Sequence, residues 1–134
     1  MTKIQKLAVF LAVAFVAPIE AYAETMSCLP HTAPMRGELR LIKTRHPAGY
    51  SIEAMQLVFR PPICVVVPAL AESGRLEQLD VREMHIVPQK QFLDRLKRSL
   101  GRMVTARGDI GETHTAWHQG DAIMFDAVVL HIED

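Results

Sequence analysis

The sequence has few of the features that identify a function directly. It carries 15 basic and 15 acidic side chains, so its formal net charge is zero, and this balance gives no global attraction to nucleic acid or to an anionic membrane. Only 6% of the residues are aromatic and one is tryptophan, which leaves few rings for stacking on single-stranded nucleic acid. With two cysteines, the chain lacks the cysteine density of the usual structural zinc sites.

The N-terminus has the layout of a secretory signal peptide. Lys3 and Lys6 form a short positive region ahead of an apolar run at 7–16, and Ala21-Tyr22-Ala23 supplies small residues at a cleavage site. The run is shorter than the about 20 residues that cross a bilayer, which disfavours an uncleaved anchor or a buried N-terminal helix. We therefore predict a signal peptide at 1–23, a periplasmic or secreted mature protein, and no membrane span in it.

The remaining residues, 24–134, are predicted to form a single domain that contains both cysteines. An even cysteine count in an oxidising compartment predicts a disulfide between Cys28 and Cys64. The alternative is a lipoprotein with its lipid on Cys28, but Met26 suits that signal poorly.

Alternation of apolar and polar residues predicts five strands in this domain. The alternating segments are 35–41, 55–67, 79–87, 104–110 and 123–132. Pro61-Pro62 predicts a bend or a sheet edge within the second strand. The alternation slips at Arg82-Glu83 and near Ala127-Val128, and these slips predict β-bulges in the third and fifth strands.

One helix is predicted between strands 3 and 4. Apolar residues recur there with helical spacing, and Gly101 is placed to end the helix; the apolar residues are Phe92, Leu93, Leu96 and Leu100. An oligonucleotide/oligosaccharide-binding (OB) fold is a five-stranded Greek-key barrel, and its linking helix occupies this position. We predict a mainly β, OB-like barrel. An open α+β sheet remains the alternative, because periodicity does not decide whether a sheet closes.

Several segments together resemble the bacterial family called domain of unknown function 4431. These segments are "CLPHTAPMRGELRL", "QLVFRPPICVVV", "LDVREMHIV" and "LGRMVTARGDIGETHTAWHQGDAIMFDAVVL", and they cover nearly all of the predicted mature chain. The resemblance implies a small exported β-domain with a histidine-containing hairpin loop and no established activity. Cys64 matches the family pattern and Cys28 lies where an upstream cysteine is common. In the last loop His114, Thr115 and His118 match, whereas Trp117 and Gln119 stand where histidines would fit, which weakens a metal role.

The stretch "HTAWHQ", from His114 to Gln119, is the strongest candidate for a site. In an OB fold, the loops that join strands 1–2 and 4–5 flank the ligand face, and here they place Tyr50, His114, Trp117 and His118 at one end of the barrel. Tryptophan and tyrosine offer large, rigid contact areas with a polar tip, as binding surfaces require. The alternative is that Trp117 folds back to cap the core.

A metal site is the other interpretation of the same loop. His114 and His118 are four residues apart, a spacing that places two ligands on one side only in a helix, whereas glycines at 111 and 120 indicate a hairpin. Glu112 or Asp121 would have to complete such a site across the turn. We expect no metal and no cofactor.

The residue types give little support to catalysis. No serine lies in a Gly-x-Ser-x-Gly elbow. We therefore predict an exported, non-enzymatic binding or accessory domain that binds an envelope protein, a peptide or a glycan through the Tyr50 and Trp117 loop end, and we expect no nucleic-acid partner. The alternative is a metal-binding protein or a hydrolase that uses His114 and His118.

Overall fold

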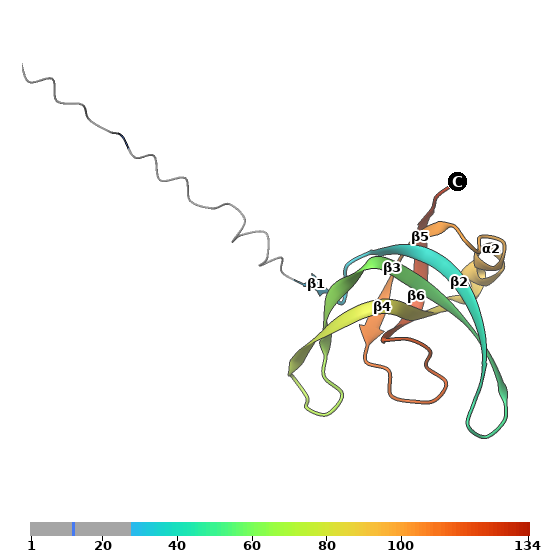
Figure 1. Cartoon of the computed structure of the whole chain (residues 1–134), viewed down its shortest axis with the longest axis horizontal. Helices are drawn as coiled ribbons and strands as arrows, with labels where there is room; N and C mark the ends of the chain where they lie inside the picture. Colours follow the sequence, from blue (N-terminus) through green and yellow to red (C-terminus); the bar gives the residue numbers. More distant parts are fainter. Residues whose placement is uncertain (1–11, 13–27) are drawn as a thin grey trace, which may run out of the picture.

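The predicted strands are present, and most are longer than the alternation alone suggested. The computed structural model describes residue 12 and residues 28–134 (Figure 1). The signal peptide predicted at 1–23 therefore lies, apart from one residue, outside the described part of the chain. The strands are β1 (Leu29–Pro30), β2 (Met35–Arg45), β3 (Ser51–Pro68), β4 (Leu76–Pro88), β5 (Met103–Gly111) and β6 (Ala122–Ile132).

The five long strands close into a barrel. β2 pairs with β3 and β5, β3 with β4, and β5 with β6, all antiparallel, and the parallel pairing of β4 with β6 completes the ring. One short helical segment separates β4 from β5, the third and fourth long strands. This is the mainly β, OB-like barrel that the sequence predicted, and the closure excludes the open α+β sheet. The two-residue β1, which was not predicted, adds a parallel pairing with β3.

The barrel interior is filled by rows of apolar side chains that cross the strands. In one row Leu39 pairs with Leu57, Leu57 with Met84, and Met84 with Ala122, and all four are fully buried. Successive residues of a strand point to opposite faces. The flanking row of Arg40, Gln56 and His85 therefore lies on the outer face of β2, β3 and β4.

The second predicted strand is continuous through its two prolines. Its register against β4 shifts between Val58, opposite Glu83, and Ile63, opposite Val81. The extra residues thus lie in β3, facing Arg82, and the bulge predicted at Arg82-Glu83 is on the wrong strand of the pair. The slip predicted near Ala127-Val128 is present, since the β5–β6 register is irregular there.

The helix is shorter than predicted. A 3₁₀ turn, η1 (Lys90–Phe92), leads into α2 (Leu93–Lys97), and Arg98 is the C-cap, so Gly101 does not end the helix. The Ser99 amide bonds to the Leu96 carbonyl at 2.9 Å, an i→i−3 bond that tightens the turn and stops the α-helical pattern. Leu96 is fully buried, but Leu100 is 42% exposed and is not on the packed face.

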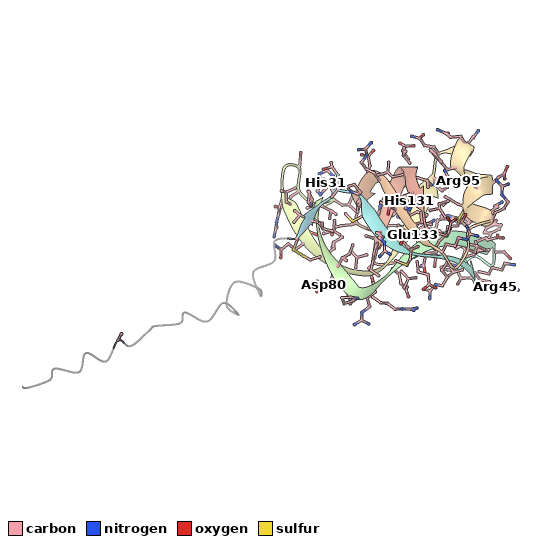
Figure 2. The ribbon with its side chains drawn as sticks, turned by 90° about the horizontal axis from the view of Figure 1, so that it is seen from above. His31, Arg45, Asp80, Arg95, His131 and Glu133 are labelled. Atoms are coloured by element: carbon pink, nitrogen blue, oxygen red, sulfur yellow. A yellow bond between two sulfur atoms is a disulfide. The ribbon has the colours of Figure 1, made fainter. Side chains whose placement is uncertain are left out.

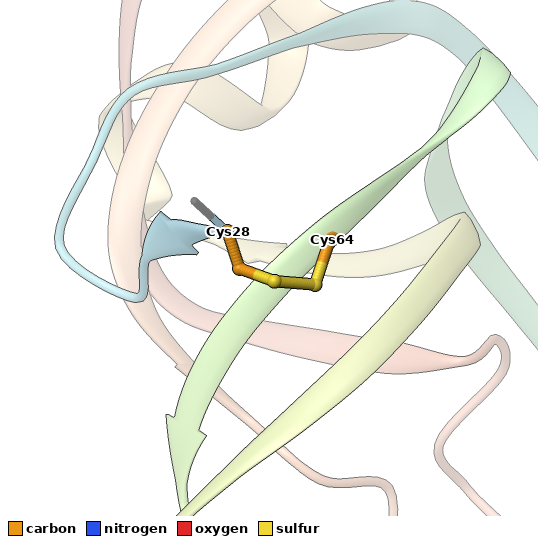
Figure 3. Close-up of a disulfide and its surroundings, with 2 residues drawn as sticks. All are labelled: Cys28 and Cys64. Atoms are coloured by element: carbon orange, nitrogen blue, oxygen red, sulfur yellow. A yellow bond between two sulfur atoms is a disulfide. The ribbon is translucent and has the colours of Figure 1, made fainter. Parts of the chain in front are cut away.

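The predicted disulfide between Cys28 and Cys64 is present (Figure 3). Its Cα atoms are 4.7 Å apart, and it ties the residue before β1 to the half of β3 that follows the bulge. Disulfides form and persist in oxidising compartments, so this bond is more typical of extracytoplasmic proteins. Among the described residues, no helix is long and apolar enough to cross a membrane.

Candidate binding site at the loop end

Three connections between strands lie at the same end of the barrel (Figure 1). They are the β2–β3 loop at 46–50, the β3–β4 loop at 69–75 and the β5–β6 loop at 112–121. The Leu70 amide donates to the Glu112 carboxylate at 3.0 Å, which ties the second loop to the third. Ring contacts tie the first loop to the third, so the β5–β6 loop occupies the middle.

His46, Tyr50 and Trp117 form an aromatic cluster across the first and third loops. The centroid of the Trp117 ring system is 4.6 Å from that of His46 and 6.2 Å from that of Tyr50, with interplanar angles of 30° and 29°. Trp117 is 48% exposed and Tyr50 is 64% exposed. Trp117 therefore does not cap the barrel core; it lies against another loop and offers about half of its surface to solvent.

Hydrogen bonds within the β2–β3 loop fix the two rings that it contributes. The His46 amide donates to the Tyr50 carbonyl at 2.7 Å, and the Gly49 amide donates to the His46 carbonyl at 2.8 Å. Gly49 has φ +93°, a backbone conformation that side chains other than glycine rarely adopt. This tight turn holds His46 and Tyr50 beside each other.

A separate turn presents Trp117. The Trp117 amide donates to the Thr115 hydroxyl at 3.3 Å, and the His118 amide donates to the Thr115 carbonyl at 3.1 Å. The Gln119 side-chain amide donates to the Ala116 carbonyl at 2.8 Å. Threonine hydroxyls commonly stabilise such turns. Thr115 therefore organises the residues whose Trp117 ring reaches His46.

The main chain of Gln119 anchors this loop to the outer face of the barrel. Its amide donates to His85 Nδ1 at 3.0 Å, and its carbonyl accepts from the Gln56 side chain at 2.8 Å. Gln56 is 2% exposed and also accepts from Arg40 at 2.8 Å, and Arg40 continues to Glu83 at 2.9 Å. Buried amides need such partners. The outward-facing residues Arg40, Gln56 and His85, one on each of three neighbouring strands, therefore hold the loop in place, and we call them its seat.

Gly120 and Asp121 hold the same, C-terminal end of the loop against β4. One Asp121 carboxylate oxygen accepts from the Arg82 and Glu83 amides at 2.9 and 3.3 Å. A Cβ at Gly120 would lie 2.6 Å from the Glu83 carbonyl oxygen, and this residue has φ +141°. Only glycine fits this close approach of the two backbones. The Asp121 carboxylate thus accepts hydrogen bonds from β4 amides and is not free to bind a metal.

The remaining rings form a histidine group beside the aromatic cluster. His118 lies 4.5 Å from His114, 6.4 Å from His85 and 5.6 Å from Phe125, measured between ring centroids. His118 Nδ1 accepts from the His114 amide at 3.2 Å, just as His85 Nδ1 accepts from Gln119. Both contacts require an unprotonated Nδ1.

Burial favours these neutral rings. It lowers the pKa of His85, and the nearby His118 lowers it further; burial also lowers the pKa of His118, with a smaller effect from His114. Across residues 28–134, no three side chains of histidine, cysteine, aspartate or glutamate lie in a grouping that could hold a metal ion. In this arrangement His85 and His118 act as acceptors that shape the loop.

The structure therefore divides the four predicted site residues between two neighbouring groups. Tyr50 and Trp117 meet in the aromatic cluster, and His114 and His118 meet in the histidine group. Sequence reasoning missed Gln56 and His85, which seat the loop. Their alternation placed them outward, but only the β3–β4 register shows that they face each other.

Comparisons with known proteins place this chain in no family. No family model matches it, and no curated protein matches it. Among solved structures, a chain from "Plasmodium falciparum SSB complex with ssDNA" aligns with 14% identity and a TM-score of 0.35, over 74% of this chain and 93% of that chain. A likeness of this size carries no functional argument.

Proposed function

We propose that this protein is an exported, disulfide-linked binding domain that takes a glycan or peptide of the cell envelope on its aromatic cluster. The observation that carries the proposal is the exposure of Trp117 and Tyr50, at 48% and 64%, on two loops that hydrogen bonds hold in place. Large rings left in solvent on well-held loops are typical of binding surfaces, because they bring contact area at a low cost in conformational entropy.

The surface offers both kinds of contact that such a ligand needs. The ring faces of Trp117 and Tyr50 suit the apolar face of a sugar or an apolar side chain, while the indole N–H and the phenol O–H can reach polar groups. An envelope protein could bind in the same way if it presented a peptide segment with an apolar side chain to these rings. The resemblance to domain of unknown function 4431 and the signal-peptide pattern support export, and the disulfide agrees with it.

Isothermal titration calorimetry with soluble muropeptides tests this proposal, because these fragments carry both a sugar and a peptide. We expect heat of binding with the unaltered mature protein and at least about tenfold weaker binding for Trp117→Ala, since central aromatic residues carry much of the energy of an interface. Leu76→Ala is the matched control, because Leu76 is an exposed apolar residue (61%) outside the cluster. Equal binding by both variants would contradict the role of the cluster.

Trp117 also provides a direct optical signal, because it is the single tryptophan of the sequence. A ligand that covers its ring should change the emission maximum, and Tyr50→Ala should reduce the change. We expect no change with single-stranded oligothymidylate, since the chain has no net positive charge. If the oligonucleotide quenched Trp117 emission at physiological salt, nucleic acid would be favoured as the ligand in place of an envelope glycan or peptide.

The metal or hydrolase alternative predicts a different result. Metal analysis of protein purified without a histidine tag should find no stoichiometric zinc or copper, because His118 Nδ1 accepts from a backbone amide and Asp121 is committed to β4. Stoichiometric metal that is lost in His114→Ala would favour the alternative.

A further inference from the structure

A cavity that is separate from the aromatic cluster lies beside the disulfide. Figure 2 shows Asp80, the neighbour of Cys64 across β3 and β4, at one end of the molecule, and Arg45, next to the β2–β3 loop, at the other. Beside the disulfide and the β3 bulge is a cavity of about 550 Å³. Its size is within the range of about 300–1,000 Å³ that is typical of small-molecule sites.

The wall of this cavity is predominantly apolar. It includes Val58, Phe59, Ile63 and Met103, and the Cys28–Cys64 disulfide forms a further part. Water beside such a wall finds few hydrogen-bond partners, and an apolar group that displaces it gains free energy in proportion to the area covered. The irregular stretch of β3 between Val58 and Ile63 forms much of the wall.

Two arginines line the cavity, and they differ in how far their charge is already compensated. Arg36 makes a two-pronged contact with Glu133, at 2.6 and 2.8 Å, so its charge is matched within the protein. Arg60 has one acidic group within 4 Å among residues 28–134, Glu38 at 3.8 Å, and its side chain is 72% exposed. A contact of that length is not a hydrogen bond, so the Arg60 guanidinium is available to an incoming anion.

Arg60 also extends this positive character beyond the cavity. It lines a neighbouring hollow of about 360 Å³ together with Arg40, Arg82 and Glu83. Glu83 pairs with Arg40 at 2.9 Å, which leaves Arg60 and Arg82 as the positive charges not matched within this hollow. The polar group that the cavity favours is therefore an anion placed at the Arg60 side. A guanidinium presents donors in a planar fork that matches a carboxylate.

We propose that this cavity binds a small monocarboxylic acid with an apolar body, of the fatty-acid class, with its carboxylate at Arg60. The apolar wall covers the body of the ligand and Arg60 supplies the complementary charge. This site is independent of the aromatic cluster and of the envelope ligand proposed for it.

Decanoate and decanol are the probes, because they share a ten-carbon chain and differ in charge. With isotope-labelled mature protein, decanoate should shift the amide resonances of β3 around Val58 and Ile63 and that of Met103. Decanol should bind about tenfold more weakly, since a hydrogen bond to a charged group contributes about 1.5–3 kcal/mol and tenfold corresponds to about 1.4 kcal/mol.

Arg60→Gln separates the role of charge from the role of apolar contact. It should weaken decanoate about tenfold and leave decanol unchanged, because only the first interaction uses the guanidinium. Arg75→Gln is the matched control, since Arg75 is similarly exposed (61%) with one loose partner, Glu72 at 3.4 Å, and should change neither affinity.

Specific outcomes would overturn the proposal. They are the absence of shifts up to the solubility limit of decanoate, shifts that centre away from the cavity, and an Arg60→Gln variant that binds decanoate as well as the unaltered protein does. Preference for a peptide with a free apolar C-terminal residue over decanoate would also overturn the ligand class. Because Arg60 is exposed, we expect the Arg60→Gln variant to fold normally. An unchanged amide spectrum for the remaining residues will show that it does.

Discussion

Replacing Gln56 tests whether the outer face of the barrel positions the candidate binding loop. This side chain is 2% exposed; its oxygen accepts from Arg40 and its amide donates to the Gln119 carbonyl, each at 2.8 Å. Gln56→Ala removes both contacts. Gln56→Glu keeps an acceptor for Arg40 but places a carboxylate oxygen against the Gln119 carbonyl oxygen, so it removes the loop contact alone.

The size of the effect follows from these two bonds. A neutral hydrogen bond contributes about 0.5–1.5 kcal/mol and one to a charged group about 1.5–3 kcal/mol. Arg40 keeps its contact with Glu83 at 2.9 Å, so the variant leaves no isolated charge, and the sum is not increased by a desolvation penalty for an unpaired ion. We expect Gln56→Ala to lower the free energy of unfolding by about 2–4 kcal/mol.

Two measurements distinguish the loop from the barrel. Urea unfolding followed by circular dichroism gives the free energy of unfolding, and Trp117 emission reports the β5–β6 loop. Both variants should shift the emission toward that of a fully exposed indole. Gln78→Ala, on an exposed position of β4, should change neither. If Gln56→Ala stays within about 0.5 kcal/mol of the unaltered protein, as surface changes usually do, and the emission is unchanged, the seat is not what positions the loop.

Three further predictions concern other parts of the molecule. Trp117→Ala should cost at most about 2.5 kcal/mol, because about half of a side chain of about 200 Å² is already exposed and the buried half contributes about 25 cal/mol per Å². A loss of about 3–5 kcal/mol in urea unfolding would assign Trp117 to the core. The pKa values of His85 and His118 are lowered in the folded protein, whereas histidines of the unfolded chain have a pKa of about 6.5. As the solution is acidified, the unfolded state therefore takes up protons before the folded state does. The melting midpoint should therefore be highest above that pH and fall below it, with a smaller fall in His85→Gln; an equal fall in that variant would contradict the assignment. Mass spectrometry under non-reducing conditions should show Cys28 and Cys64 lacking two hydrogens, and replacing both by alanine should cost about 3–4 kcal/mol for a separation of 36 residues, whereas two free thiols would contradict the bond.

Much of the barrel was predictable because the sequence expresses it locally. Alternation located five strands, and the helix position narrowed the topology to an OB-like order. The helix length was not predictable from periodicity, since the i→i−3 bond at Ser99 ends α2 before Leu100 can join the apolar face. The bulge was assigned to β4 because a slip in alternation marks an irregular pair without showing which strand holds the extra residues.

The candidate site was predictable in its residues but not in its grouping. Loop position was sufficient to bring Tyr50 and Trp117 together, because adjacent connections of this topology share one end of the barrel. The seat formed by Arg40, Gln56 and His85 depends on strand register, which a single sequence specifies only through long-range pairing. The cavity beside the disulfide depends on the same register, since the wall comes from the shift in β3.

The direction of β6 has a practical consequence for experiments at a surface. This strand starts next to the β5–β6 loop and runs for 11 residues to Ile132, which at about 3.3 Å per residue is roughly 35 Å. Figure 1 shows the chain end projecting on the side away from the loops. A biotin acceptor peptide fused after Asp134 would therefore immobilise the protein on a sensor with its aromatic cluster facing the flow, so that even a polymeric ligand such as an insoluble cell-wall fragment could reach it without steric hindrance from the support.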